Sequence, residues 1–259
     1  MGSDNKLKSN RVGEVSYTKY GTKATIVEYI NNKKILVEFD DDFNYRYYTS
    51  YMNFKNGSMT NPYEKRSGND IGYIGVGKYN SKNSPEAYYK WRAIIQRCYC
   101  QDYKDENNQS IASYEPCTVC EEWLCFQNFA DWYYSNRYEC DEPLCVDKDI
   151  LFHNNKEYSL TKCLLVPRRI NLLFIKELGR RGDLPIGVQT HKQHDGYVVY
   201  ISKDNKSHYV GMFWDIQKAF NAYKKEKEKY IKEVADEYKF VIPTKIYDAM
   251  YQYEILITD

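Results

Sequence analysis

Residues 144–174 read LCVDKDILFHNNKEYSLTKCLLVPRRINLLF, and this stretch decides the fold. Two apolar runs, LCV and CLLV, flank a polar segment with the pair Asn154-Asn155, and Pro167 precedes a further apolar run. Asparagine pairs favour tight turns between strands, and proline favours the first turn of a helix. The stretch therefore predicts a strand, an Asn-Asn turn, a second strand and a helix opened by Pro167. Packed in this way, a hairpin and a helix can present an acidic residue, a base and an amide to one metal ion.

The residues before this stretch show a helical period. From Pro85, with Ser84 as the expected cap, apolar residues recur every three or four positions, at Tyr88, Trp91, Ile94, Ile95 and Cys98. A second helix is predicted over residues 121–134. Its aromatic stripe is typical of a buried core, and consists of Trp123, Phe126, Phe129 and Trp132.

Residues 11–63 contain three β-branched or aromatic runs, ATIVEYI, KKILVEF and NYRYYTSY. They predict strands of a small antiparallel sheet, with tight turns at Asn31-Asn32 and at the acidic triplet 40–42. The triplet has no spaced partner set, so capping of the turn is favoured over metal binding. Residues 67–84 are rich in Gly, Asn and Ser and read as a linker with one short strand, because they lack the features of a phosphate loop.

The last third has three short strand-like runs, at Val188, at residues 197–202 and at residues 208–213, followed by a helix from about Ile216. Apolar residues on one face of that helix, Ala219, Phe220 and Tyr223, predict three strands packed on one helix. The helix is expected to continue to about Tyr238, to break at Pro243, and to be followed by a short helix and a strand that pack on the core.

Together these patterns predict an α+β protein. A small antiparallel β module is expected over residues 11–63, a linker over 64–84, and a central helical and ββα domain over 85–178. A three-stranded sheet with a helix is expected over 184–240, and a tail packed on the core over 241–259.

Composition limits the function classes. The 259 residues carry a net charge of +1, so polyanion binding would have to come from local clusters, such as residues 176–232, where 12 Lys/Arg face 7 Asp/Glu. A solvated helix face is the alternative explanation of that bias. No apolar run is long enough for a membrane span and the polar start has no secretion signal, so we expect a cytoplasmic protein without a membrane partner. The eight cysteines are then expected to be reduced.

Several motifs of residues 85–175 coincide in order and spacing: YYKWRAIIQRC, VCEEWLCFQNF, VDKDIL, YSLTKC and VPRRIN. This order resembles a family of phage-encoded proteins related to HNH endonucleases. The resemblance implies a hairpin on which an Asp binds a divalent cation, Mg²⁺ or Mn²⁺, a His activates water, and an Asn completes the metal site.

On this sequence the implied metal-binding Asp is Asp147, but Lys148 stands where the His is expected and Lys162 stands near the expected Asn. Two cations would repel a metal ion, which favours a retained scaffold over an active nuclease. If the centre is active, the catalytic candidates are Asp147, Lys148 and His153, and the metal ligands are Asp147 with Asn154, Asn155 or Asn171. The alternatives are a solvated turn for His153 and surface ion pairs for Asp147 and Asp149.

A structural zinc site usually shows two ligand pairs at knuckle spacing, and the chain has only one CxxC, at Cys117 and Cys120. The sequence therefore favours packing over zinc for these cysteines.

Residues 187–223 carry a second set of motifs: Gly187-Val188, an aromatic strand over 197–201, Gly211 to Phe213, and a helix over 219–223. They resemble the ethylene-response-factor type of DNA-binding domain, although its usual arginines are missing. The resemblance implies a sheet that lies in the major groove of double-stranded DNA. The matching contact positions are Gln189, His191, Lys192, Tyr197, Tyr200, Ser202, Lys203, Lys206 and Tyr209.

The hypothesis from sequence is a DNA-binding protein of a phage or mobile element, derived from an HNH homing-type endonuclease with a degenerate centre. One alternative is an active metal-dependent endonuclease or nickase. A second is a protein that binds and modulates a host protein through tyrosine-rich surfaces, since the chain has 28 Tyr beside 10 Phe and 4 Trp.

Overall fold

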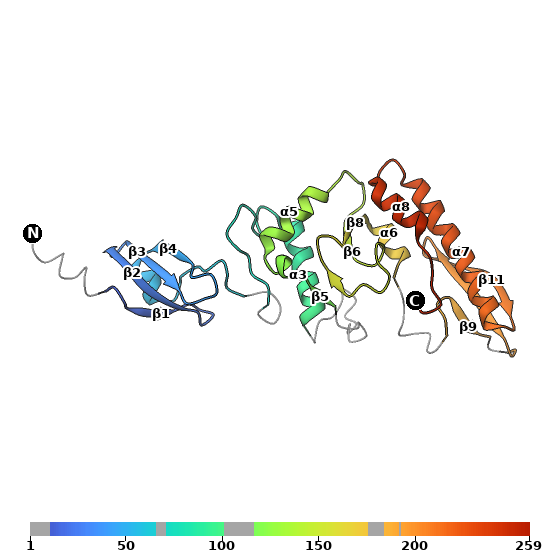
Figure 1. Cartoon of the computed structure of the whole chain (residues 1–259), viewed down its shortest axis with the longest axis horizontal. Coiled ribbons are helices and arrows are strands. Elements are labelled where there is room, and N and C mark those ends of the chain that lie inside the picture. The colour runs from blue at the N-terminus through green and yellow to red at the C-terminus, as the bar shows by residue number, and fades with distance from the viewer. Residues whose placement is uncertain (1–10, 66–70, 101–116, 176–183, 192) are drawn as a thin grey trace, which may run out of the picture.

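The computed structural model describes residues 11–65, 71–100, 117–175, 184–191 and 193–259. The protein is a mixed α+β structure. An N-terminal antiparallel sheet, a helical middle and a C-terminal sheet packed on helices follow one another along the long axis, in chain order (Figure 1). No helix within the described ranges is long and apolar enough to cross a bilayer.

The N-terminal sheet has four strands in the order β1-β2-β3-β4, one more than predicted. They are β1 (Val15–Tyr17), β2 (Lys23–Asn31), β3 (Lys34–Phe39) and β4 (Arg46–Thr49), and helix α2 (Tyr51–Lys55) follows. Alternate residues of β2 and β3 are buried, which is the period of a sheet with one packed face. The β2-β3 turn lies at residues 32–33, one position later than predicted. In the acidic turn, the Asp41 carboxylate accepts a hydrogen bond from the N–H of Phe43 at 2.9 Å, as a capping residue does.

The helical middle is built from α3 (Pro85–Tyr99), β5 (Thr118–Val119), α4 (Glu121–Leu124) and α5 (Phe126–Asn136). The single helix predicted over residues 121–134 is broken at Cys125, whose backbone is extended. The reason is a parallel bridge between Cys125 and Tyr73, from the glycine-rich segment of the chain. Trp123 is buried as predicted, and the indole of Trp91 donates to its carbonyl at 2.6 Å.

The stretch over residues 144–174 forms β6 (Leu144–Asp147), β7 (Glu157–Tyr158), β8 (Leu164–Pro167) and α6 (Arg168–Leu173). Strand β6 pairs antiparallel with β8, and Asn154 adopts the expected turn conformation with φ 55°. The prediction of a tight Asn-Asn hairpin is wrong, however, because a long loop separates the two paired strands. Within that loop β7 pairs with β5 instead, in parallel.

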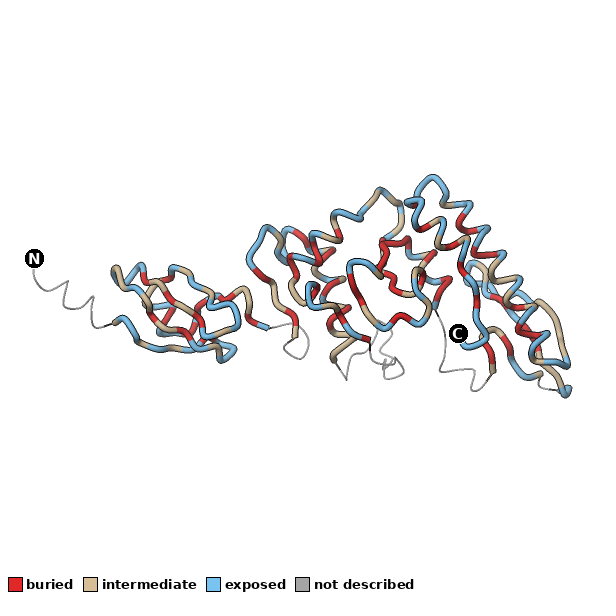
Figure 2. Tube along the Cα trace, in the orientation of Figure 1, coloured by how far each residue is buried: buried red, intermediate tan, exposed pale blue. Residues whose placement is uncertain are grey.

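All four residues of β8 are buried, and alternate residues face different cores. Leu164 and Val166 pack with the C-terminal sheet and its helices, whereas Leu165 and the preceding Cys163 pack with the helical middle. Figure 2 shows the buried positions concentrated along this part of the chain. Because successive side chains of a strand point to opposite faces, this one short strand packs into both cores.

The C-terminal sheet has the order β11-β10-β9, from β9 (Val188–Thr190), β10 (Tyr197–Lys203) and β11 (Lys206–Phe213). One face of the sheet packs on α7 (Ile216–Glu237), which buries Ala219, Phe220 and Tyr223 as predicted.

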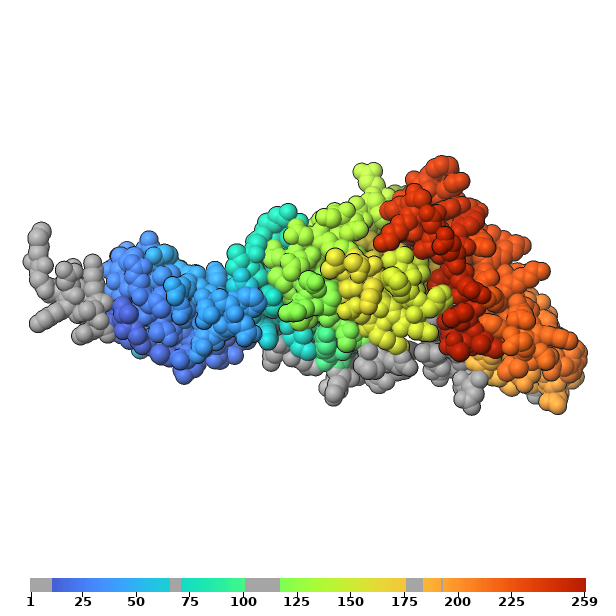
Figure 3. All heavy atoms as spheres, viewed as in Figure 1, coloured from blue at the N-terminus to red at the C-terminus, as the bar shows by residue number. Residues whose placement is uncertain are grey.

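Helix α8 (Thr244–Gln252) packs on α7 through Ile246 and Met250, and Tyr253 and Ile255 continue into the same core. In Figure 3 these C-terminal residues (red) lie between the middle residues (yellow) and the sheet (orange). Residues 253–259 form no strand, so that part of the prediction is wrong.

Lys227 lies on the core-facing side of α7, one turn from the buried Tyr223 and from the buried Tyr230. Burial lowers the pKa of its ammonium group to about 8, from an ordinary 10.5. Between these two pH values Lys227 binds more protons in the unfolded chain than in the folded chain, so its contribution to the free energy of unfolding rises with pH across the window.

We expect Lys227→Met to raise the free energy of unfolding at pH 7 by about 1–2 kcal/mol, because a partly desolvated charge is removed. Urea unfolding at pH 7 and at about pH 9.5 measures this, with the exposed Lys225→Met as the control. A variant less stable than the parent at pH 7, or a stability gain over the parent that does not shrink between pH 7 and about pH 9.5, contradicts the assignment.

Candidate functional site

Asp147, the residue implied to bind a metal ion, ends strand β6 and is 6% exposed. Its Oδ1 accepts hydrogen bonds from the N–H groups of Asp149 at 2.9 Å and of Ile150 at 2.8 Å. Burial outweighs these donors and raises the pKa of Asp147 to about 6. The carboxylate therefore closes the first turn of the loop, in the way a side chain caps a helix.

Lys148 and Asn155 tie the two ends of this loop together. The buried Lys148 ammonium donates to the carbonyl of Asn155 at 2.8 Å and to Asp149 Oδ1 at 2.7 Å. The Asn155 amide donates in return to the carbonyls of Lys148 at 2.9 Å and of Glu157 at 2.8 Å, and its Oδ1 accepts from the N–H of Glu157 at 3.0 Å. The amide of Asn155 is thus engaged by backbone groups at both of its polar atoms.

His153 is not a solvated turn residue. Its ring stacks on Tyr253 with centroids 4.5 Å apart, and its Nδ1 lies 3.6 Å from Asp259 Oδ1. Both partners belong to the C-terminal tail, so the structure places His153 against the tail. Of the other predicted positions, Lys162 pairs with Glu157 at 2.6 Å, and Asn171 lies within α6.

These residues do not fit a Mg²⁺ or Mn²⁺ site. Within the described ranges, no three His, Cys, Asp or Glu side chains are grouped so that they could hold a metal ion. Oδ1 of Asp147 and Oδ1 of Asn155 accept backbone N–H groups of the loop. The geometry is that of a structural loop.

The cysteines are all free. Burial raises the pKa values of the Cys98 and Cys163 thiols to about 12, which keeps both protonated at neutral pH.

The second candidate surface is the face of the C-terminal sheet that lies opposite α7. Along β10, Val199 and Ile201 point into the core, so Tyr200 and Ser202 point away from it. The cross-strand neighbours of these outward-pointing β10 residues share the same face of the sheet. Together they form three rows, with seven side chains in all, which we call the open face. Its rows are Gln189 with Val198 and Met212, Tyr200 with Tyr209, and Ser202 with Ser207.

The tyrosine row is the most accessible part of the open face. Tyr200 is 38% exposed and Tyr209 is 60% exposed, and their ring centroids lie 5.6 Å apart. Gln189, Ser202 and Ser207 are also exposed. The open face therefore offers amide and hydroxyl groups together with apolar ring surface.

Four of the predicted contact residues lie on the open face: Gln189, Tyr200, Ser202 and Tyr209. Tyr197 and Lys203 do not, because they follow the alternation of Val199 and Ile201. Tyr197 packs against the core, and the Lys203 ammonium lies 3.9 Å from Glu226 Oε2 and 5.3 Å from the Tyr230 ring centroid, both on α7.

The other three predicted contacts lie at the ends of the sheet or outside the described residues. His191 orders the β9-β10 connection, where its Nδ1 accepts the N–H groups of Gln193 and His194 at 3.1 and 3.0 Å. Lys206 is exposed at the β10-β11 turn. Lys192 lies outside the described residues. Sequence reasoning missed Val198, Ser207 and Met212, whose alignment across the sheet depends on a register shift between Val199 and Tyr200.

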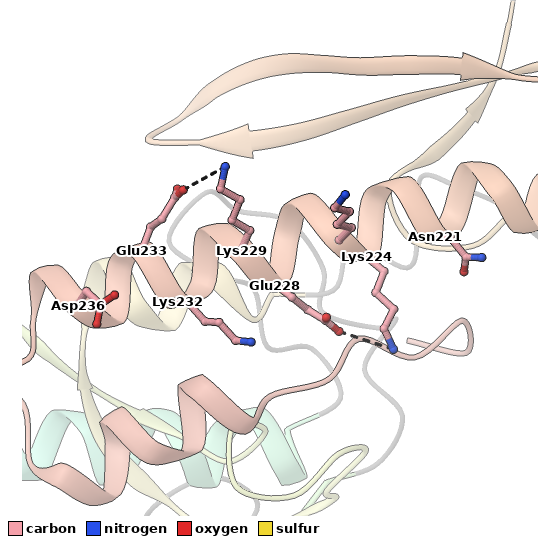
Figure 4. Close-up of a pocket in the computed structure, with 8 residues that line it drawn as sticks. Asn221, Lys224, Glu228, Lys229, Lys232, Glu233 and Asp236 are labelled. Atoms are coloured by element: carbon pink, nitrogen blue, oxygen red, sulfur yellow. Dashed lines mark ion pairs between the residues drawn. The ribbon is translucent and has the colours of Figure 1, made fainter.

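None of the seven side chains of the open face is charged. Most of the lysines nearby lie on the outer side of α7, along a shallow groove of about 640 Å³ (Figure 4). There Lys224 lies 3.6 Å from Glu228, and Lys229 lies 3.8 Å from Glu233. Within each pair the lysine and glutamate charges offset each other, as is usual on a solvated helix face.

Comparison with known proteins found no matching family model, no similar curated protein and no similar solved structure.

The raised pKa of Asp147 generates a test of its structural role. Between about pH 4 and pH 6, Asp147 binds more protons in the folded chain than in the unfolded chain, so its contribution to stability is greatest below this window and is lost as pH rises through it. Asp147→Asn keeps the acceptor oxygen without the charge, so we expect it to be at least as stable as the parent at pH 7. Asp147→Ala removes two hydrogen bonds, and should cost about 1–3 kcal/mol.

Urea unfolding of these variants at both ends of the window measures the difference, with the exposed Asp248→Asn as a control. If Asp147→Asn were as damaging as Asp147→Ala at pH 7, the turn-capping role would be wrong.

Proposed function

We propose that this protein binds double-stranded DNA through the open face of its C-terminal sheet. The observation that supports this most is the open face itself, a row-by-row display of hydrogen-bonding and aromatic side chains that no helix covers within the described residues. The resemblance of residues 187–223 to a DNA-binding sheet agrees with this use of the face. The proposal places the protein in the cytoplasm of the host of a phage or mobile element.

The dimensions of the sheet suit the major groove. The seven residues of β10 span roughly 20 Å at the usual rise of a strand, and the groove is about 12 Å wide and admits β-strands. The amide and hydroxyl groups of the open face would then meet the donors and acceptors of base edges.

Groups that suit phosphate contacts lie at the ends of the sheet. Lys206 is exposed at the β10-β11 turn, opposite Lys203 and at the end of the sheet, and His194 is exposed in the connection at the other end. Lys206 would reach a phosphate around the end of the sheet, because it shares the α7 side with Lys203. Phosphate contacts position a protein on the duplex, whereas base contacts carry the sequence information. In this proposal the open face makes the base contacts, and the two ends of the sheet make the phosphate contacts.

The ββα segment has a structural part in this proposal. The motif order of residues 85–175 supports descent from an HNH-type endonuclease, and the engagement of Asp147 by backbone donors supports loss of its metal-binding role. The loop would hold the sheet in place and would not cut DNA.

A second candidate function, binding of a host protein, is favoured by the absence of charge on the open face. The open face carries tyrosine, methionine and serine but no lysine or glutamate. Such a composition is found in protein interfaces and paratopes. The two functions differ in salt dependence, because only phosphate neutralisation releases condensed counterions.

We expect the full chain to bind a duplex of about 20 base pairs at low salt, with an affinity that falls steeply as salt rises. Lys206→Ala should lower the slope of log K against log salt by about one. The double variant Tyr200→Ala, Tyr209→Ala should weaken binding roughly 10-fold through lost hydrogen bonds and apolar contact.

Fluorescence anisotropy with labelled duplex measures these effects, and Tyr89→Ala, an exposed tyrosine of α3, is the matched control. Absence of binding at low salt, or a flat salt dependence, would overturn the DNA proposal in favour of a protein partner.

A further inference from the structure

We infer that the open face selects A·T-rich duplex DNA, with Gln189 as the residue that reads adenine. This inference rests on the proposed function, because it names the class of duplex that the open face would take. The inference rests on two observations. The strand register places an amide in one row with an apolar side chain, and two nearby cations are held away from the open face.

The first row of the open face carries one group that suits adenine and one that suits thymine. Gln189 lies opposite Val198 on β10, and Val198 lies opposite Met212 on β11. A glutamine amide can donate to adenine N7 and accept from the adenine N6 amino group, and an apolar side chain can contact the methyl group of thymine. Gln189 is exposed and Met212 is half-buried, whereas Val198 is only 9% exposed, so Met212 is the apolar side chain of this row that can reach a methyl group. Neighbouring strands lie about 4.8 Å apart, so Gln189 and Met212, which are two strands apart, are separated by roughly three base-pair steps of about 3.4 Å.

The groups that would read guanine are absent from the open face. Guanine presents two acceptors in the major groove, and arginine or lysine is the side chain that satisfies both. None of the seven open-face residues is a cation. Such a face leaves guanine O6 and N7 without charged donors.

Two cations near the sheet, Arg169 and Lys203, are held away from the open face by their own partners, whereas Lys206 is exposed at the β10-β11 turn. Arg169 Nε donates to Asp204 Oδ1 at 3.0 Å, and its Nη1 donates to Glu237. Lys203 is held towards α7 by Glu226 and Tyr230. Within the described residues, these two side chains cannot reach the open face without leaving those contacts.

The two remaining rows do not discriminate between base pairs. Serine hydroxyls accept and donate, so Ser202 and Ser207 can meet either base pair. The same holds for the hydroxyls of Tyr200 and Tyr209. The preference is therefore assigned to the row of Gln189, and its loss should leave general duplex binding in place.

The test compares three duplexes of equal length with the full chain: an A·T-rich duplex, a G·C-rich duplex, and the A·T-rich duplex with deoxyuridine in place of thymidine. We expect the A·T-rich duplex to bind roughly 10-fold more tightly than the G·C-rich one. The deoxyuridine duplex, which lacks the methyl groups, should lie between them. Gln189→Ala should reduce the ratio of the A·T-rich to the G·C-rich affinity several-fold, while Gln217→Ala, an exposed glutamine of α7, should not change it.

The outcomes separate this inference from the proposed function. If neither duplex binds, DNA binding itself fails and the inference fails with it. If both bind equally, DNA binding stands and the A·T selection is wrong. If the A·T preference persists unchanged in Gln189→Ala, another feature reads the sequence and the assignment to Gln189 is overturned. A thermal melt of each variant, monitored by circular dichroism, shows that the substituted chain is folded.

Discussion

Strand β8 lies between two hydrophobic cores, and the positions of the remaining elements depend on it. Cys163 and Leu165 pack into the helical middle, whereas Leu164 and Val166 pack into the core shared with the C-terminal sheet. A strand with both faces buried is the wall between two packed layers, and no part of its side-chain surface is left for a ligand. Strand β8 is therefore an interior element, whereas Cys145 and Val146 of its partner β6 are half-buried.

The residues that follow β8 fix the C-terminal sheet. The backbone N–H of Arg169 donates to Glu142 Oε2 at 3.0 Å, and its guanidinium holds Asp204 in the β10-β11 turn. The hydroxyl of Tyr230 donates to the same Asp204 carboxylate at 3.0 Å. One arginine thus connects the segment before β6, helix α6 and the tip of the sheet.

The sequence allowed the strongly periodic elements to be predicted, including the helix from Pro85, three of the four strands of the N-terminal sheet and the three strands before α7. It did not reveal the bridge from Tyr73 that breaks the helix at Cys125, nor the pairing of β7 with β5, because both join residues far apart in the chain. The sequence did not show that Tyr197 and Lys203 face away from the other candidate contacts. Their direction depends on which alternate residues of β10 pack on α7. Asp147 shows a further limit, because a carboxylate that caps a turn and one that binds a metal ion have the same sequence signature.

The most direct test of a binding sheet on a structural ββα scaffold uses supercoiled plasmid incubated with the full chain, with and without Mg²⁺ or Mn²⁺. We expect the plasmid to be retarded in a gel and to remain supercoiled, in the parent and in Asp147→Asn alike, whether or not metal is added. Metal-dependent nicking by the parent that is lost in Asp147→Asn would contradict the account, since it would show that Asp147 holds a metal ion for cleavage.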